Sequence, residues 1–181
     1  MELREIRSRR DWRDIKRLYK EAFPASEKRP FWMIRRKYHR GEADVLAIEN
    51  DGEFAGLAIT MNGEDMVLLD YFAIRKDRRN GGIGAMALKA LQDRYDGRRL
   101  FLEIENADNP GEGQEERVRR KRFYLANGMK ELGVNVSLFG VDMELLGYEC
   151  RVDFLEYREL YHSVYGSWAS KQVVEISGEE I

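Results

Sequence analysis

The chain has 181 residues, and its 31 basic and 33 acidic residues leave a formal net charge of −2. Because 43% of the residues are apolar and the charges nearly cancel, a wholly disordered chain is excluded, and the composition does not point to a bulk nucleic-acid binder. This length predicts one compact domain over residues 1–176, followed by a disordered tail at 177–181. Arginine supplies 22 of the basic residues, and its planar fork suits carboxylate and phosphate recognition.

Disulfide, metal and membrane chemistry have little support in the sequence. Cys150 is the only cysteine and there are two histidines, so we expect no disulfide and no metal site. The N-terminus lacks the apolar core of a signal peptide. The longest uncharged stretch, residues 133–141, is far shorter than the roughly 20 apolar residues of a membrane helix. We therefore expect a cytoplasmic protein with no membrane partner.

The first part of the chain passes from helical to strand patterns. Asp11 is expected to cap a helix that Pro24 ends, and Asn50, Asp51 and Gly52 give a strong turn signal between two strands. The apolar periodicity predicts a short strand near residues 3–6, helices at 11–23 and 31–40, and strands at 44–49, 54–61 and 66–74.

The second part begins with a glycine-rich loop. A helix follows that loop and ends at Asp96 and Gly97, and Gly128 is expected to act at the C-terminus of a later helix. The patterns predict a buried strand at 100–105, a polar loop at 106–116, a helix at 116–127, paired strands at 134–139 and 141–146, and a helix at 154–165.

The glycine loop is the most informative segment of the sequence. A buried strand ending at Ile74 leads into four basic residues and one acid, a local charge of +3, and then into Gly81, Gly82, Ile83 and Gly84 at a helix start. Glycines let a ligand approach the backbone closely, and a helix N-terminus offers free N–H donors with a partial positive charge. These features predict a site for a phosphate or pyrophosphate.

Other interpretations of the loop are weaker. Gly82, Gly84 and Ala87 fit a dinucleotide-binding fingerprint, but the seven residues 75–81 intervene after the strand and a second strand–helix half is missing. A P-loop is excluded because no Gly-Lys-Ser/Thr follows. The remaining alternative is an ordinary tight loop that enters a helix.

Two motifs resemble the GNAT superfamily of N-acetyltransferases. Residues 79–84 fit its R/Q-x-x-G-x-G/A motif, and residues 122–129, from Arg122 through Phe123 and Tyr124 to Met129, resemble its second signature, with Met129 in place of the usual Phe. Residues 44–146 match the element order of the family. The resemblance implies an α/β fold with a mixed, mostly antiparallel sheet, a central splayed pair of parallel strands and flanking helices.

The resemblance also implies acetyl-CoA as co-substrate, without a metal. In the family, the pantetheine arm pairs with the backbone at the strand end and the pyrophosphate lies on loop amides. The implied cofactor-binding residues are Ala73, Ile74, Arg78, Arg79, Asn80, Gly81, Gly82, Ile83 and Gly84. The implied reaction is direct transfer of an acetyl group to a primary amine in a ternary complex.

Acetyl transfer needs a base for the amine and an acid for the departing thiolate. The second motif places Tyr124 as the candidate acid, with helix packing as the alternative. Glu103 is the first candidate base, because two carboxylates on one face of a central strand can raise one another's pKa. Asp70 is the second, because an unpaired carboxylate in an apolar strand is costly. Glu105 shares a strand face with Glu103. Each carboxylate has a paired, structural alternative.

The partners are less well defined by the sequence. The acceptor is a small-molecule or peptide amine, and Phe31, Trp32, Tyr38 and Tyr71 either line its pocket or belong to the core. The basic run at 117–122 is expected to be a solvated helix face, partly paired to nearby glutamates, or a clamp on CoA phosphates rather than a nucleic-acid site. A homodimer and a non-catalytic acyl-CoA-binding or regulatory module with the same fold both stay open.

Overall fold

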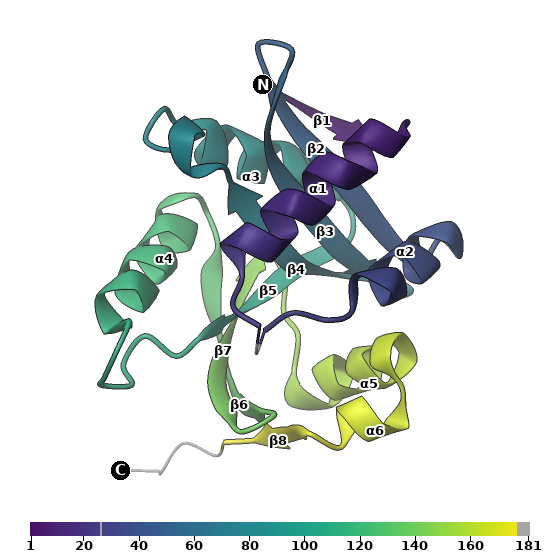
Figure 1. Ribbon diagram of the computed structural model, residues 1–181. Helices are drawn as coiled ribbons and strands as arrows, with labels where there is room; N and C mark the ends of the chain where they lie inside the picture. The colour runs from purple at the N-terminus through teal and green to yellow at the C-terminus, as the bar shows by residue number, and fades with distance from the viewer. Residues whose placement is uncertain (26, 177–181) are drawn as a thin grey trace. The chain divides into compact units, whose positions relative to one another are not determined.

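The computed structural model describes residues 1–25 and 27–176 (Figure 1). The predicted tail at 177–181 lies outside the described residues. Eight strands form one mixed sheet in the order β1-β2-β3-β4-β5-β7-β6-β8. The strands are β1 (Glu2–Glu5), β2 (Ala43–Asn50), β3 (Glu53–Asn62), β4 (Met66–Ile74), β5 (Arg99–Glu105), β6 (Lys130–Leu138), β7 (Val141–Tyr148) and β8 (Val173–Glu175). The helices are α1 (Arg9–Ala22), α2 (Phe31–His39), α3 (Ile83–Arg94), α4 (Gln114–Ala126), α5 (Phe154–Tyr165) and α6 (Ser167–Ser170).

Contacts divide the chain into two compact units. Unit 1 comprises residues 1–62 and 69–95, and unit 2 comprises residues 63–68 and the chain from residue 96 onward. Strand β4 therefore contributes its first residues to unit 2 and its last six to unit 1. A single domain over residues 1–176 stays a prediction.

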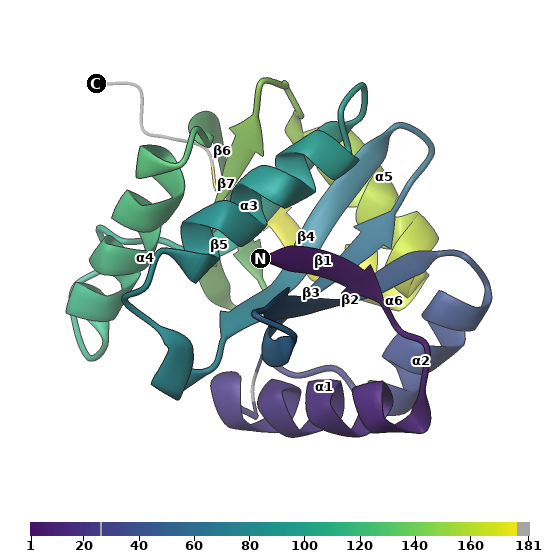
Figure 2. The ribbon, with the colours of Figure 1, turned by 90° about the horizontal axis from the view of Figure 1, so that it is seen from above.

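Unit 1 is a helix-covered antiparallel sheet. Strands β1 and β2 pair antiparallel, as do β2 and β3. Helices α1 and α2 lie on one face of these strands and α3 lies on the opposite face (Figure 2). The core contains Ile15, Leu18 and Tyr19 from α1 and Ile34 from α2, all buried. This arrangement matches the apolar spacing that the sequence shows.

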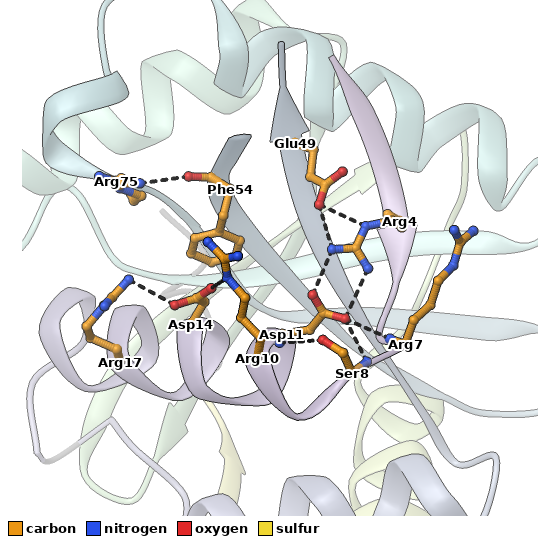
Figure 3. Close-up of polar contacts among 10 residues, drawn as sticks. All are labelled: Arg4, Arg7, Ser8, Arg10, Asp11, Asp14, Arg17, Glu49, Phe54 and Arg75. Carbon is orange, nitrogen blue, oxygen red and sulfur yellow. Dashed lines mark hydrogen bonds and ion pairs between the residues drawn. The ribbon is translucent and has the colours of Figure 1, made fainter. Parts of the chain in front are cut away.

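The start of α1 differs from the expected cap. Ser8, not Asp11, is the N-cap, and the two residues form a reciprocal capping box. Asp11 also accepts from the Arg4 guanidinium at 2.8 Å, and Arg4 pairs at the same time with Glu49 of β2 (Figure 3). The Arg4 guanidinium is the main cause that holds the pKa of Asp11 well below its usual range. The charged N-terminus of α1 is thereby tied to strands β1 and β2.

Unit 2 contains the parallel pair of the sheet. Residues Met66–Leu68 of β4 pair in parallel with Arg99–Phe101 of β5. Strand β5 then pairs antiparallel with β7, β7 with β6, and β6 with β8. The mixed, mostly antiparallel sheet with one parallel pair confirms the predicted fold class.

Two short elements of unit 2 were not predicted. Gly166, with a φ of +86°, ends α5 and precedes the four-residue α6, and β8 adds three residues to the sheet beside β6. Both are too short to give a readable periodicity. Within the described residues, no helix is long and apolar enough to cross a membrane.

Candidate functional site

The glycine loop belongs to unit 1 and leaves directly from the end of β4. The Arg75 amide donates to Ala55 O at 2.9 Å, and the Arg75 guanidinium donates to Phe54 O at 2.9 Å (Figure 3). The same guanidinium holds Asp77 through two contacts, at 3.0 and 2.7 Å. Arg75 thus fixes the first turn of the loop, a 3-10 helix at Lys76–Arg78, to strand β3.

The other arginines of the loop also have protein partners. Arg78 forms an ion pair with Glu53, and the Arg79 Nε donates to Ile74 O at 3.0 Å. The predicted local charge of +3 is therefore partly neutralised within unit 1. Because the Arg78–Glu53 pair is half-exposed, it is worth little energetically and can exchange for another anion.

The backbone of the loop ends in an open helix start. Asn80 and Gly82 have φ values of +66° and +76°, and Gly82 is the N-cap of α3 without any side-chain cap. The first intrahelical bond runs from the Met86 amide to Gly82 O at 3.1 Å, so the preceding helix amides have no intrahelical acceptor. A Cβ placed on Gly81 or Gly82 would meet no atom within 4 Å. The helix start therefore has amides without an intrahelical acceptor, and the backbone before it borders open space at Gly81 and Gly82.

Gly56 of β3 allows the close packing that positions this loop. A Cβ on Gly56 would lie 2.5 Å from Ala73 O and 2.9 Å from the Ile74 side chain. Ile74 packs with Ile48, Ala55, Ile83 and Ala87 in one buried cluster. Gly56 is not among the site residues predicted from the sequence, although a glycine inside a strand often marks a close approach of backbone.

Asp70 lies on β4 in unit 1, next to a dense aromatic group. Neighbouring Tyr71 has its ring 4.8 Å from Tyr19 and 5.0 Å from Phe23, and its hydroxyl donates to Glu27 O at 2.9 Å. Burial and the charge of Asp70 raise the pKa of Tyr71. Tyr71 is thus part of the packed core, which is the second of its two predicted roles.

Tyr124 lies in the last turns of α4, in unit 2. It is buried, with 8% of its surface exposed, and its ring meets Phe123 edge-on at 5.2 Å. Burial raises the pKa of Tyr124 to about 12, and Arg120 opposes the rise. The hydroxyl is therefore protonated at neutral pH, as an acid must be before it acts.

Helix α4 ends as expected near Gly128. Gly128 has a φ of +90°, and its amide and that of Met129 donate back to Leu125 O and Tyr124 O at 3.2 and 3.1 Å. These two backbone hydrogen bonds form a Schellman motif. It fixes the helix turn that carries Tyr124.

The two glutamates of β5 have different partners in unit 2. Glu103 accepts a hydrogen bond from the Tyr157 hydroxyl of α5, while Glu105 lies 3.5 Å from the Arg117 guanidinium. Glu105 is therefore a paired carboxylate, which is the structural alternative given for it above. Nothing in the sequence around residue 157 indicates that Tyr157 would meet Glu103, because 54 positions separate them.

The basic residues at 117–122 are partly paired with acidic residues of unit 2. Lys121 lies 2.7 Å from Glu144 and also pairs with Glu131, and Arg119 lies 3.6 Å from Glu116. The expected pairing to a nearby glutamate is confirmed for Arg119. Across residues 1–25 and 27–176, no cluster of His, Cys, Asp and Glu could hold a metal ion.

The mixed sheet with its short parallel pair belongs to an α/β protein. The basic loop before the uncapped start of α3 is a candidate site for a phosphate-bearing ligand. The model of the acetyltransferase (GNAT) family matches residues 12–113. The chain belongs to this family. A search of curated proteins returned no match.

Solved structures show the same fold. A protein from Bacteroides thetaiotaomicron, assigned to the GNAT family, superposes with a TM-score of 0.77 at 22% identity, covering 92% of this chain and 99% of that one. A variant of spermidine N-acetyltransferase from Vibrio cholerae gives 0.63 at 14% identity, over 82% and 94%. An acetyltransferase from Bacillus subtilis in complex with CoA gives 0.59 at 13% identity, over 82% and 97%.

Proposed function

We propose that this protein is an N-acetyltransferase that moves an acetyl group from acetyl-CoA to a primary amine of a small molecule or peptide, by direct transfer in a ternary complex. The observation that carries the proposal is the uncapped start of α3, which follows a basic loop and faces open space at Gly81 and Gly82. Membership of the acetyltransferase family and a CoA-bound structure of the same fold support it.

The residues of the loop fit a CoA pyrophosphate. Amides at the start of α3 would bind the phosphate oxygens, and Arg78 and Arg79 lie within the same short segment. The backbone at Ala73 and Ile74 would hold the pantetheine arm as an added strand. Asn80, with its left-handed backbone, shapes the turn between them.

Acetyl-CoA supplies the activated acyl group, and the side chains handle the protons. Glu103 is proposed to take a proton from the acceptor amine as its nitrogen bonds to the acyl carbon, with Asp70 as the alternative base. As the C–S bond breaks, Tyr124 gives its hydroxyl proton to the sulfur. Tyr157 positions the Glu103 carboxylate through its hydrogen bond.

The acid role is tested with Tyr124→Phe, which keeps the ring and removes the proton. Turnover should fall by about 10²-fold or more, while the Kd for acetyl-CoA stays within about twofold. Equal turnover in the variant would remove Tyr124 from the acid role. Because the aromatic ring remains, thermal denaturation should show the variant to be folded.

The second candidate function is a non-catalytic acyl-CoA-binding module. It is distinguished by a screen of amine classes that includes polyamines, amino acids, peptide N-termini and lysine side chains, with release of free thiol as the readout. The proposal predicts thiol release with at least one class. CoA binding without thiol release from any class would favour the binding module.

The lone Cys150 and the absence of a disulfide fit a cytoplasmic location.

A further inference from the structure

A hollow in unit 1 has no role in the proposed acetyl transfer. Its volume is about 410 Å³, within the range of ligand-binding sites. Helices α1 and α2 lie on the same face of the unit 1 strands (Figure 2). Their residues form most of the lining of the hollow. The side chains that line it include Trp12, Lys16, Lys20, Phe31, Trp32 and Arg35.

Helical spacing explains how the hollow forms. Trp12, Lys16 and Lys20 are four residues apart, so they project from one stripe of α1. Ile15 and Leu18 lie on a different stripe and are buried in the core. Of the stripe that borders the hollow, Trp12 packs edge-on against Tyr38 at 5.2 Å, while Lys16 and Lys20 carry charge to its rim.

Cations lie over the aromatic rings of this hollow. The Arg35 guanidinium is 5.0 Å from the centre of the Trp12 ring, and the Lys16 ammonium is 6.0 Å from the centre of the Phe31 ring. The Trp12 and Phe31 rings meet edge-on at 6.0 Å. The result is an apolar floor with positive charges held above it.

Three cations of the hollow have no acidic partner among the residues that the structure describes. Within residues 1–25 and 27–176, no ion pair involves Lys16, Lys20 or Arg35, since Asp11 pairs with Arg4 and Asp14 with Arg17. Residues 9–40 contain twelve Lys and Arg and four Asp and Glu, a net charge of +8. The rest of the chain has nineteen basic and twenty-nine acidic residues, a net charge of −10. The positive charge is therefore concentrated in this helical pair.

Trp32 adds a large exposed apolar surface at the edge of the hollow. Its side chain is 63% exposed, although a tryptophan normally buries most of its surface. We propose that the hollow binds an acidic polypeptide segment, with a bulky apolar side chain of that segment packed against Trp32 and its carboxylates paired to Lys16, Lys20 and Arg35. Charge complementarity and the apolar floor together define this partner.

A peptide fits this surface better than single-stranded nucleic acid does. Bases bind single-strand sites by stacking on exposed ring faces. Here Arg35 and Lys16 already cover the faces of Trp12 and Phe31, which leaves Trp32 as the one exposed ring among the described side chains of the hollow. Carboxylates, by contrast, can pair directly with the guanidinium and ammonium groups.

The probe for this site is a peptide with two glutamates on each side of a leucine, acetylated at its N-terminus and labelled with fluorescein at its C-terminus. It has no free amine, so its binding does not depend on the acetyl transfer proposed above. Fluorescence anisotropy should show saturable binding that weakens as salt is added. A second peptide with serine in place of leucine should bind at least about fivefold more weakly.

Matched variants locate the binding. Arg35→Glu should weaken the leucine peptide about tenfold or more, and Trp32→Ala should weaken it too without disturbing the fold, because that side chain is exposed. Arg158→Glu is the control, since Arg158 also lies over a ring, 5.2 Å from the centre of Phe154 in unit 2. It should leave the affinity unchanged.

Three outcomes would overturn the proposal. Unchanged affinity in both Arg35→Glu and Trp32→Ala would remove the hollow as the binding site. Equal affinity for the leucine and serine peptides would leave only a diffuse cationic surface. Displacement of the peptide by a lower concentration of oligothymidylate would assign the surface to nucleic acid.

Discussion

Helices α3 and α4 begin with the same backbone geometry, one in each unit. Each has a glycine N-cap with a φ of +76°, Gly82 for α3 and Gly113 for α4, and neither has a side-chain cap. Judged by backbone alone, both helix starts are anion sites. Their surroundings separate them.

The first turn of α4 contains acidic side chains and the first turn of α3 does not. Glu115 and Glu116 lie in the first turn of α4, and the Arg117 guanidinium lies 3.4 Å from where a Cβ on Gly113 would be. The first turn of α3 has no acid, and the space beside Gly81 and Gly82 is open. The availability of a helix start therefore depends on the absence of acids from its first turn more than on the nearby arginines.

The largest expected effect is on the free energy of unfolding and comes from a substitution in β3, the strand that packs against β4 where the loop before α3 begins. Gly56→Ala would place a Cβ 2.5 Å from Ala73 O, a backbone atom that cannot move without shifting β4. The free energy of unfolding, measured in urea, should fall by about 3 kcal/mol. Gly81→Ala, with nothing within 4 Å, is the control and should change it little. Equal effects would mean that the close approach of β3 and β4 is not required.

The second-largest expected effect is the pH dependence of stability caused by Tyr124, which is buried near the C-terminal end of α4. Because its folded-state pKa of about 12 exceeds the unfolded value of about 10, its contribution to stability is complete below pH 10 and is lost as the pH rises through 12. The stability of the wild type relative to Tyr124→Phe should fall by about 2–3 kcal/mol across that window. A pH-independent difference would contradict the burial of this hydroxyl.

A direct exchange of features between the two helices should give a smaller effect. Ala85→Glu puts an acid into the first turn of α3, as in α4. The carboxylate would compete for the free amides, so CoA affinity measured by calorimetry should weaken about tenfold, about 1.4 kcal/mol. Helix α3 itself should gain about 0.3–1 kcal/mol from its dipole. Glu115→Gln in α4 is the control and should leave CoA affinity unchanged.

The smallest effect lies in the turn between β6 and β7. Phe139 and Gly140 have φ values of +51° and +83°, a turn that favours Asn before Gly. Phe139→Asn relieves the strain of an aromatic residue in the left-handed region, against the loss of its 5.6 Å ring contact with Trp168. The melting temperature should rise by about 2–4 °C. A lower melting temperature would show that the ring contact outweighs the strain.

Local patterns were sufficient to predict most elements of the fold. Strand β4 and helix α5 have the predicted limits of 66–74 and 154–165, because Gly63 precedes the nearly all-apolar run of β4 and Gly166 follows α5. The sequence favours Asp11 as the cap of α1 whereas the structure has Ser8, since both residue types can cap and only the backbone geometry separates them. Elements of three or four residues, α6 and β8, gave no pattern.

The backbone of the candidate site was more predictable than its side-chain partners. The glycines at 81, 82 and 84 already indicate an open helix start. The partner of Arg78 is Glu53, 25 positions away, and the partner of Glu103 is Tyr157 on another element. Such pairs depend on strand register and helix docking, which no local pattern contains. The sequence alone therefore overestimates how many basic residues of the loop are available to bind a phosphate, because some of them already form ion pairs.

The CoA site at the start of α3 is tested most directly by titrating ¹⁵N-labelled protein with CoA and following the amide signals of the two helix starts. The signals of Gly81, Gly82 and Gly84 should shift with saturation while those of Gly111 and Gly113 stay in place. Shifts at Gly113 with none at Gly82, or no saturable shift at either helix start, would contradict it.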